Sequence, residues 1–324
     1  MNINEGGKFM AEFNTAGQNG LMKLVHSNLD AGVTKAFTES SVLLSVLPFI
    51  DNKGSLDYYY NVIDAGFTAK FRELGENVAG EQIAPETKHE RLKIMTADVV
   101  LDRLITSGRV GNITDIKAEN TLVATSSLAG QFCKAFYYGE GKTNEKAFVG
   151  LSPRIADGIG VQLEGLSLAN IDQAIDTISY NNQGVKVLLM NNKTRREVQR
   201  LVKAEGFTLT TMELAGQSVT QYDGLPIVVD PNIKDGEIFA VNFNEADGVC
   251  GVTLDGIKAT DQGHEGTAYR IAVEGVMAIA VKRPDAFALV KGALSLQTRY
   301  LANATDMVVE GTNVSDSLKT KKAK

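Results

Sequence analysis

Two strand-like segments in the first third of the chain are longer than a compact domain can use, and they constrain the fold more than any other feature. Residues 55–72 (SLDYYYNVIDAGFTAKFR) are rich in Tyr, Phe, Val and Ile and alternate roughly every second residue, and residues 88–101 (KHERLKIMTADVVL) alternate again. The residues between them, 73–87, hold two glycines and one proline, too long a connection for a tight turn. The pattern predicts one long hairpin whose first strand would reach ~60 Å at ~3.3 Å per residue. We expect such a hairpin to pack against another chain.

Segments before and after this hairpin predict an arm and two helices. Residues 1–32 are rich in Gly, Asn and Gln and lack periodic apolar residues, which predicts an arm without a core of its own. Residues 34–47 predict a short helix that stops before Pro48, because the residue before a proline avoids helical geometry. Apolar residues at helical spacing from Thr114 to Phe136 predict the longest helix, about 35 Å at 1.5 Å per residue.

The second half of the chain predicts an α/β region. A helix opens at Ser167, and a buried-type strand follows at Val185–Met190. Thr194 and Glu197 stand at the spacing of a capping box, which predicts a helix that starts there and ends at Gly206. Further strands are expected at Leu225–Val229, Ile238–Phe243, Val249–Leu254 and Tyr269–Val281.

Charge and cysteine content argue against several protein classes. The chain has 33 Lys and Arg residues against 39 Asp and Glu residues, a formal net charge of -6, whereas a protein that mainly grips nucleic acid needs a dense cationic surface. Cys133 and Cys250 are the only cysteines, so there is no disulfide framework. No segment approaches the ~20 consecutive apolar residues of a membrane span, and the N-terminus lacks the apolar centre of a signal peptide. We expect a soluble intracellular protein.

The residues show no pattern typical of catalysis. Gly139–Thr143 (GEGKT) is similar to the end of a phosphate-binding loop, but the first glycine of that motif would stand at Phe136, and the segment follows a predicted helix where a phosphate loop must follow a strand. His26, His89 and His264 are scattered and have no second ligand at metal-binding spacing. We therefore expect no enzyme activity, no cofactor and no metal.

A series of short sequence phrases occurs along the chain in a definite order. They are Phe71–Asn77 (FRELGEN) with Ala79–Gly80, Asp98–Arg103 (DVVLDR), Phe136–Gly139 (FYYG), Phe148–Leu151 (FVGL), Met190–Arg196 (MNNKTRR), Tyr222–Ile227 (YDGLPI), and Asp285–Leu289 (DAFAL) with Lys291–Gly292. In this order they resemble the major capsid proteins of tailed double-stranded DNA bacteriophages, which share the Hong Kong 97 fold. The resemblance covers nearly the whole chain.

This resemblance implies an α+β fold, the Hong Kong 97-like major capsid protein fold, with seven parts. They would be an N-terminal arm (1–33), an N-terminal helix region (34–54), an extended E-loop hairpin (55–101), a peripheral (P) domain with the long spine helix (102–165), an axial (A) domain (166–268), a return strand to the P domain (269–294) and a C-terminal tail (295–324).

The resemblance also implies a structural function. The chain would self-assemble into pentamers and hexamers of an icosahedral shell that encloses phage double-stranded DNA, in a virion assembled in the host bacterial cytoplasm. Its partners would be other copies of itself, scaffolding, portal and decoration proteins, and packaged DNA contacted non-specifically, with no membrane involved. The E-loop would cover the adjacent subunit. The candidate inter-subunit residues of the E-loop are Arg72, Glu73, Glu76, Asn77 and Arg91. If the four charged residues among them are ordinary solvated charges, each would contribute under ~1 kcal/mol.

Three other functions stay open at this point. An encapsulin, a nanocompartment shell protein, has the same fold, although the arm here lacks the amphipathic N-terminal helix that forms the encapsulin cargo groove. A nucleotide-binding α/β enzyme would use Gly139–Thr143 and would be stabilised by ATP or GTP. A tail or baseplate component would form rings or tubes.

Covalent cross-linking between subunits, known in some members of the family, needs a Lys, an Asn and a Glu brought together across chains. We expect no such cross-link here.

Overall fold

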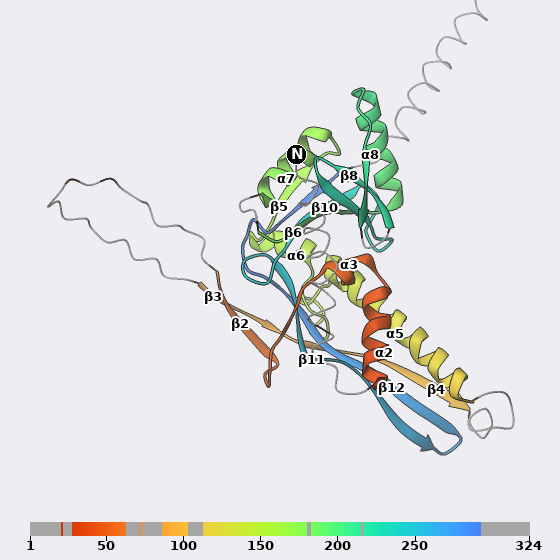
Figure 1. Ribbon diagram of the computed structural model, residues 1–324. Coiled ribbons are helices and arrows are strands. Elements are labelled where there is room, and N and C mark those ends of the chain that lie inside the picture. Colours follow the sequence, from red (N-terminus) through yellow and green to blue (C-terminus); the bar gives the residue numbers. More distant parts are fainter. Residues whose placement is uncertain are drawn as a thin grey trace, which may run out of the picture.

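The computed structural model describes residues 21, 28–62, 71, 73, 86–102, 113–179, 183–214 and 217–292. In these residues the chain forms an α+β fold with three visible parts. Figure 1 shows a helix-covered part at the top, a long tapering part below it, and a hairpin that projects to one side. No helix in the described ranges is both long and apolar enough to cross a membrane.

Eleven strands form one sheet that runs through the upper and lower parts. Its main order is β4 (Lys93–Asp102), β12 (Ala268–Val281), β11 (Val249–Glu265), β10 (Glu237–Phe243), β6 (Val185–Met190), β9 (Leu225–Val229), β8 (Gln217–Tyr222) and β7 (Thr210–Leu214). Off this path lie β1 (Phe49–Asp51) beside β11, β13 (Phe287–Lys291) beside β10, and β5 (Val161–Glu164) beside β13. A separate two-stranded sheet pairs β2 (Asp57–Val62) with β3 (Glu86–Arg91).

Strand β10 lies between two hydrophobic cores, and all seven of its residues are buried. Ile238 and Ala240 pack in the core of the upper part with α7 (Leu168–Ile178) and α8 (Asn192–Ala204). Their neighbours Phe239 and Val241 face the larger core, because successive side chains point to opposite faces of a sheet. Burial on both faces explains why β10 reads as a continuous apolar run.

The larger core lies where the long helix α5 (Ile113–Tyr138) meets α2 (Asn28–Glu39), α3 (Val42–Val46) and the sheet. Phe132 of α5 is at its centre, with ring centroids 6.1 Å from Phe37, 5.9 Å from Phe49 and 5.5 Å from Phe148. These contacts bring α2, β1 and the loop after α5 onto one helix. Each such aromatic pair adds ~0.5–1.5 kcal/mol to what its buried area contributes.

Several predicted elements are confirmed. The long helix runs from Ile113 to Tyr138, the strand Val185–Met190 has the predicted bounds, and Ser167 accepts a hydrogen bond from the Asn170 amide as the N-cap of α7. The helix predicted at 34–47 is interrupted. The Ser41 side chain caps α3, which makes that segment a second, separate helix after α2.

The predicted hairpin is wrong for its second half. Residues 86–91 pair with 57–62 as expected, but 93–102 form β4 and pair antiparallel with β12. A strand with the right alternation fits either neighbour, so its pattern could not choose the partner.

Strand β11 pairs along its length with β12, away from α7 and α8. This pairing favours grouping β11 with the P domain rather than with the A domain.

The predicted capping box is also wrong. Helix α8 begins at Asn192, and its N-cap is Asn191, whose side-chain oxygen accepts a hydrogen bond of 2.8 Å from the Thr194 amide. The Thr194 hydroxyl accepts a bond of 2.9 Å from the Gly236 amide instead. Asn is as favourable as Thr at an N-cap, so spacing alone could not place the start of the helix.

The arm predicted at 1–33 and the tail predicted at 295–324 lie largely or wholly outside the described residues. Within the arm, residues 28–33 belong to α2, and Leu21 is buried in the larger core. This part of the predicted arm therefore packs on the body of its own chain.

Candidate assembly interface

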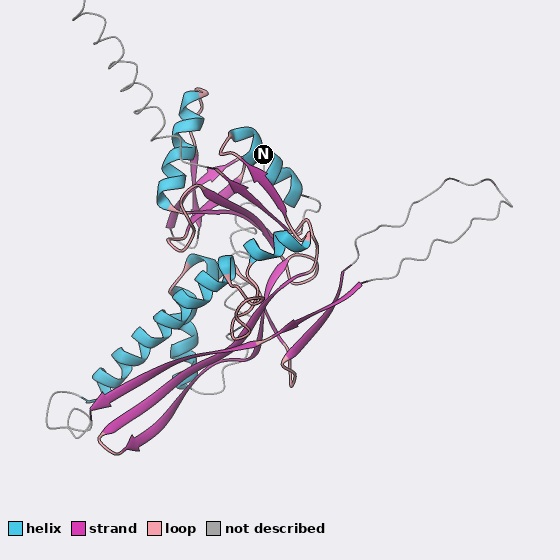
Figure 2. Cartoon of the chain, turned by 180° about the vertical axis from the view of Figure 1, so that it is seen from behind, coloured by secondary structure: helices cyan, strands magenta, loops and turns pink. Residues whose placement is uncertain are grey.

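The β2–β3 hairpin lies at the side of the body, as the two opposite views in Figures 1 and 2 show. Its two strands pair over six residue positions, and the Leu92 amide donates to the Leu56 carbonyl at 2.8 Å just below them. Tyr60 and Val62 face the body and are buried, whereas Tyr59 is 66% exposed on the opposite face. The hairpin therefore has one face on its own chain and one face free for a neighbour.

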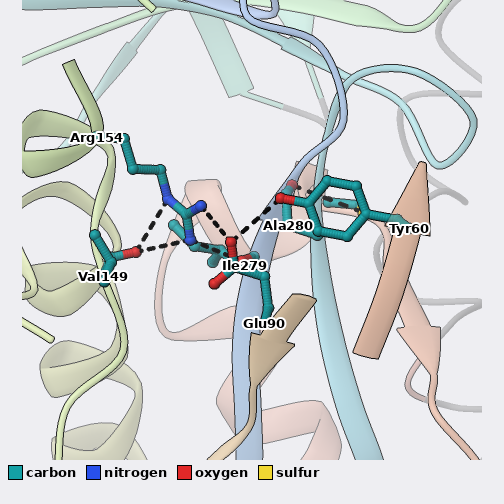
Figure 3. A network of polar contacts seen from close by, with 7 residues as sticks. Tyr60, Glu90, Val149, Arg154, Ile279 and Ala280 are labelled. Carbon is teal, nitrogen blue, oxygen red and sulfur yellow. Dashed lines mark hydrogen bonds and ion pairs between the residues drawn. The ribbon is translucent and has the colours of Figure 1, made fainter. Parts of the chain in front are cut away.

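A buried polar network holds the root of the hairpin (Figure 3). Arg154, at the end of α6 (Leu151–Arg154), donates to the Glu90 carboxylate at 2.5 Å and to the Val149 and Ile279 carbonyls, each at 3.1 Å. The Tyr60 hydroxyl donates to the same Glu90 oxygen at 3.2 Å. The network joins both hairpin strands to the loop before α6 and to β12.

The two charged side chains of this network are largely shielded from water and therefore lie in an environment of low dielectric constant. The Arg154 side chain is 4% exposed and the Glu90 side chain 15% exposed. Burial lowers the pKa of Arg154, but the charge and hydrogen bond of Glu90 more than offset this and raise it above its ordinary value. Burial, aided by the negative charge of Glu90, raises the pKa of Tyr60. Removal of one partner of such a pair costs about 3–5 kcal/mol, because the other charge stays buried.

Large apolar side chains are exposed on several elements in the described part of the chain. A few are normal on a monomer, but several on elongated elements indicate surfaces that associate. The hairpin region, β4, α5 and the loop after α8 each carry at least one: Leu56, Tyr59, Phe71, Ile94, Val100, Leu122, Val123 and Phe207.

The predicted E-loop residues fall on both sides of the described boundary. Arg72, Glu76 and Asn77 lie outside the described residues. Glu73 is exposed in the segment between β2 and β3, and Arg91 is exposed at the end of β3, opposite Asp57 in the strand register. Their role between subunits stays a prediction.

The sequence analysis missed the Arg154–Glu90 pair. These residues are 64 positions apart, and the sequence around each one has no distinctive pattern. Nothing in the local pattern marks either residue as buried. Only the path of β3 past α6 and β12 brings them together.

The glycine-rich turn after α5 has a packing role. The Gly139 carbonyl accepts a hydrogen bond of 2.8 Å from the Gly150 amide, and Glu140 bridges to Val149. A Cβ at Gly139 would lie 2.4 Å from the Phe148 carbonyl oxygen, so the glycine is needed for a close approach of two backbone segments. In the described residues, no group of three or more His, Cys, Asp or Glu residues could hold a metal ion.

Comparison with known proteins identifies the family. The sequence profile of the SU10 major capsid protein family matches residues 12–294. No curated protein matches the chain in sequence.

Solved structures share the fold at low identity. The SrpI encapsulin from Synechococcus elongatus PCC 7942 has a TM-score of 0.61 at 15% identity, covering 77% of this chain and 86% of that one. The capsid of a native GTA particle has 0.60 at 12%, covering 83% and 93%. A structure from Microbacterium phage Oxtober96 has 0.57 at 14%, covering 78% and 91%. These likenesses establish the Hong Kong 97 fold, and the profile match extends over most of the chain. The chain therefore belongs to the SU10 major capsid protein family.

Proposed function

We propose that this major capsid protein assembles into pentamers and hexamers that close into an icosahedral shell around phage double-stranded DNA. Assembly would take place in the host bacterial cytoplasm, with a scaffolding protein, a portal and decoration proteins as further partners. Packaged DNA would meet the shell wall non-specifically, which agrees with a formal net charge of -6.

The observation that carries this proposal is the β2–β3 hairpin. A two-stranded ribbon is marginal in water, and exposed strand edges invite pairing with another chain. The hairpin is nevertheless joined to the body by a buried ion pair between Arg154 and Glu90. Such a projection is stabilised once it lies over a neighbouring subunit. We propose that the hairpin, residues 55–91, covers the adjacent subunit, that residues 166–248 lie around the capsomer axis, and that Glu73 and Arg91 contribute charge contacts between subunits.

Electron microscopy and size-exclusion chromatography of the full chain test the proposal, with the protein expressed alone and with its neighbouring genes. Closed shells tens of nanometres across, or free pentamers and hexamers, are expected. A monomer or dimer under every assembly condition would contradict shell formation. Rings or tubes of one symmetry would indicate a tail component instead.

An encapsulin-type compartment is the second candidate, favoured by the TM-score of 0.61 to the SrpI encapsulin. The contents of shells purified from cells separate the two. A phage capsid made with its partner genes should contain nuclease-protected DNA after packaging, whereas a compartment should contain a stoichiometric cargo protein and no DNA.

A further inference from the structure

Two clefts open between the hairpin and the loop that follows α6. One cleft of about 340 Å³ lies between Thr87 and His89 of β3 and the loop at Asp157 and Ile159. A second cleft, of about 190 Å³, lies between Val62 and the same loop. Side chains that are not packed together cannot hold a rigid angle, because close packing is what makes protein interiors stiff. Tyr60 and Val62 pack in the larger core on the β2 side, so beside the clefts it is polar contacts that hold β3 and add to the direction of the hairpin.

Arg154 spans this gap. Its guanidinium donates to a carboxylate of β3 through Nη1, to a carbonyl of β12 through Nη2, and to the Val149 carbonyl through both Nε and Nη2. Figure 3 shows these bonds leaving the planar group toward three separate segments. A guanidinium has its donors in a fixed planar fork, so three acceptors on different segments fix its orientation and, through Glu90, that of β3.

We infer that Arg154 is a positioning residue for assembly: it sets the direction in which the hairpin leaves the body. The inference rests on the proposed function only in its last step, the effect on the shell. A lever argument shows why direction matters. The four residue steps from Glu90 to Glu86 span ~13 Å, so a rotation of ~10° at Glu90 moves the far end of β3 by ~2.3 Å, more than half the separation of two atoms in contact.

The test separates positioning from mere stabilisation. Replacing both partners of a buried ion pair with apolar residues of similar volume is often neutral or stabilising, whereas removing one is not. The double variant Arg154→Met with Glu90→Met should therefore keep the parent melting temperature but lose the directional bonds. Asp157→Asn is the matched control, because it removes an exposed ion pair with Lys142 beside the same clefts.

Pulsed electron paramagnetic resonance on unassembled full-length subunits measures hairpin direction. Spin labels are placed at Tyr59→Cys on the exposed face of the hairpin and at Gln131→Cys on the exposed face of α5. The native thiols of Cys133 and Cys250 are buried, so they should stay unlabelled.

The parent and Asp157→Asn should show one narrow distance peak, and the double variant a broad distribution at an unchanged melting temperature. A narrow, unshifted peak in the double variant would overturn the inference. Should that variant not fold, Arg154→Lys decides: it keeps the positive charge but loses the planar fork of donors, and an unchanged peak again overturns the inference.

Electron microscopy of assembled particles then tests the final step. The double variant should give aberrant or heterogeneous particles where the parent gives uniform shells, and uniform shells of parent size from the double variant would refute a role in assembly. If the parent itself forms no shells, the proposed function fails while the distance measurement on subunits still stands.

Discussion

Replacing Gly139, in the turn just after α5, with alanine should destabilise the protein far more than the same change nine residues earlier, at Gly130 within α5. A Cβ at Gly139 would lie 2.4 Å from the Phe148 carbonyl oxygen and 2.6 Å from the Ala135 carbonyl oxygen. At Gly130 the added Cβ has no atom within 4 Å. The two variants are therefore a matched pair that differ in the room around one methyl group.

The size of the effect follows from these distances. Relieving the contact at Gly139 requires the backbone segments to separate by roughly 1 Å, since favourable contacts lie at about 3.5–4.0 Å. Overpacking of this kind costs about 1–3 kcal/mol. The separation also strains the Gly150–Gly139 hydrogen bond of 2.8 Å, whose loss adds about 1 kcal/mol. Gly130→Ala should instead gain up to about 1 kcal/mol of helix propensity.

Urea unfolding of unassembled subunits, at one protein concentration, measures the difference between the two variants. We expect Gly139→Ala to be less stable than Gly130→Ala by about 2–5 kcal/mol. Equal midpoints for the two variants would refute the close approach of the segments around Gly139. A midpoint of the parent that rises with ATP would support phosphate binding in addition.

Three further predictions concern single side chains. Burial raises the pKa of Cys133 and of Cys250 to about 12, so both thiols should resist iodoacetamide at pH 8 and react only in denaturant, as read by mass spectrometry. Tyr137→Phe should lower the urea midpoint by the equivalent of about 1–3 kcal/mol, because it removes a 3.0 Å hydrogen bond and leaves the Asp230 carboxylate buried with one donor fewer; an unchanged midpoint would contradict this. Asn191→Ala should cost about 0.5–2 kcal/mol through loss of the α8 N-cap, and faster hydrogen exchange in the first turn of α8 should accompany it.

Neither the sequence nor the structure of one subunit is enough to identify the residues that make contacts between subunits. Glu73 and Arg91 are exposed, as solvated or inter-subunit charges must be, but exposure does not distinguish the two roles. The network around Arg154 was invisible in the sequence, because a buried arginine and an exposed one look alike in a local pattern. Its partner Glu90 also follows the alternation of an ordinary strand.

What the sequence determined by itself is the local structure and, through the order of its phrases, the family. Apolar spacing was enough for the long helix and for strand Val185–Met190, because side-chain periodicity follows directly from backbone geometry. Tertiary structure alone decided that residues 93–102 leave the hairpin for β12, and that Arg154 meets Glu90. Both outcomes join segments that are distant in sequence. They depend on complementary surfaces that exist only once the chain has folded, and no local period encodes them.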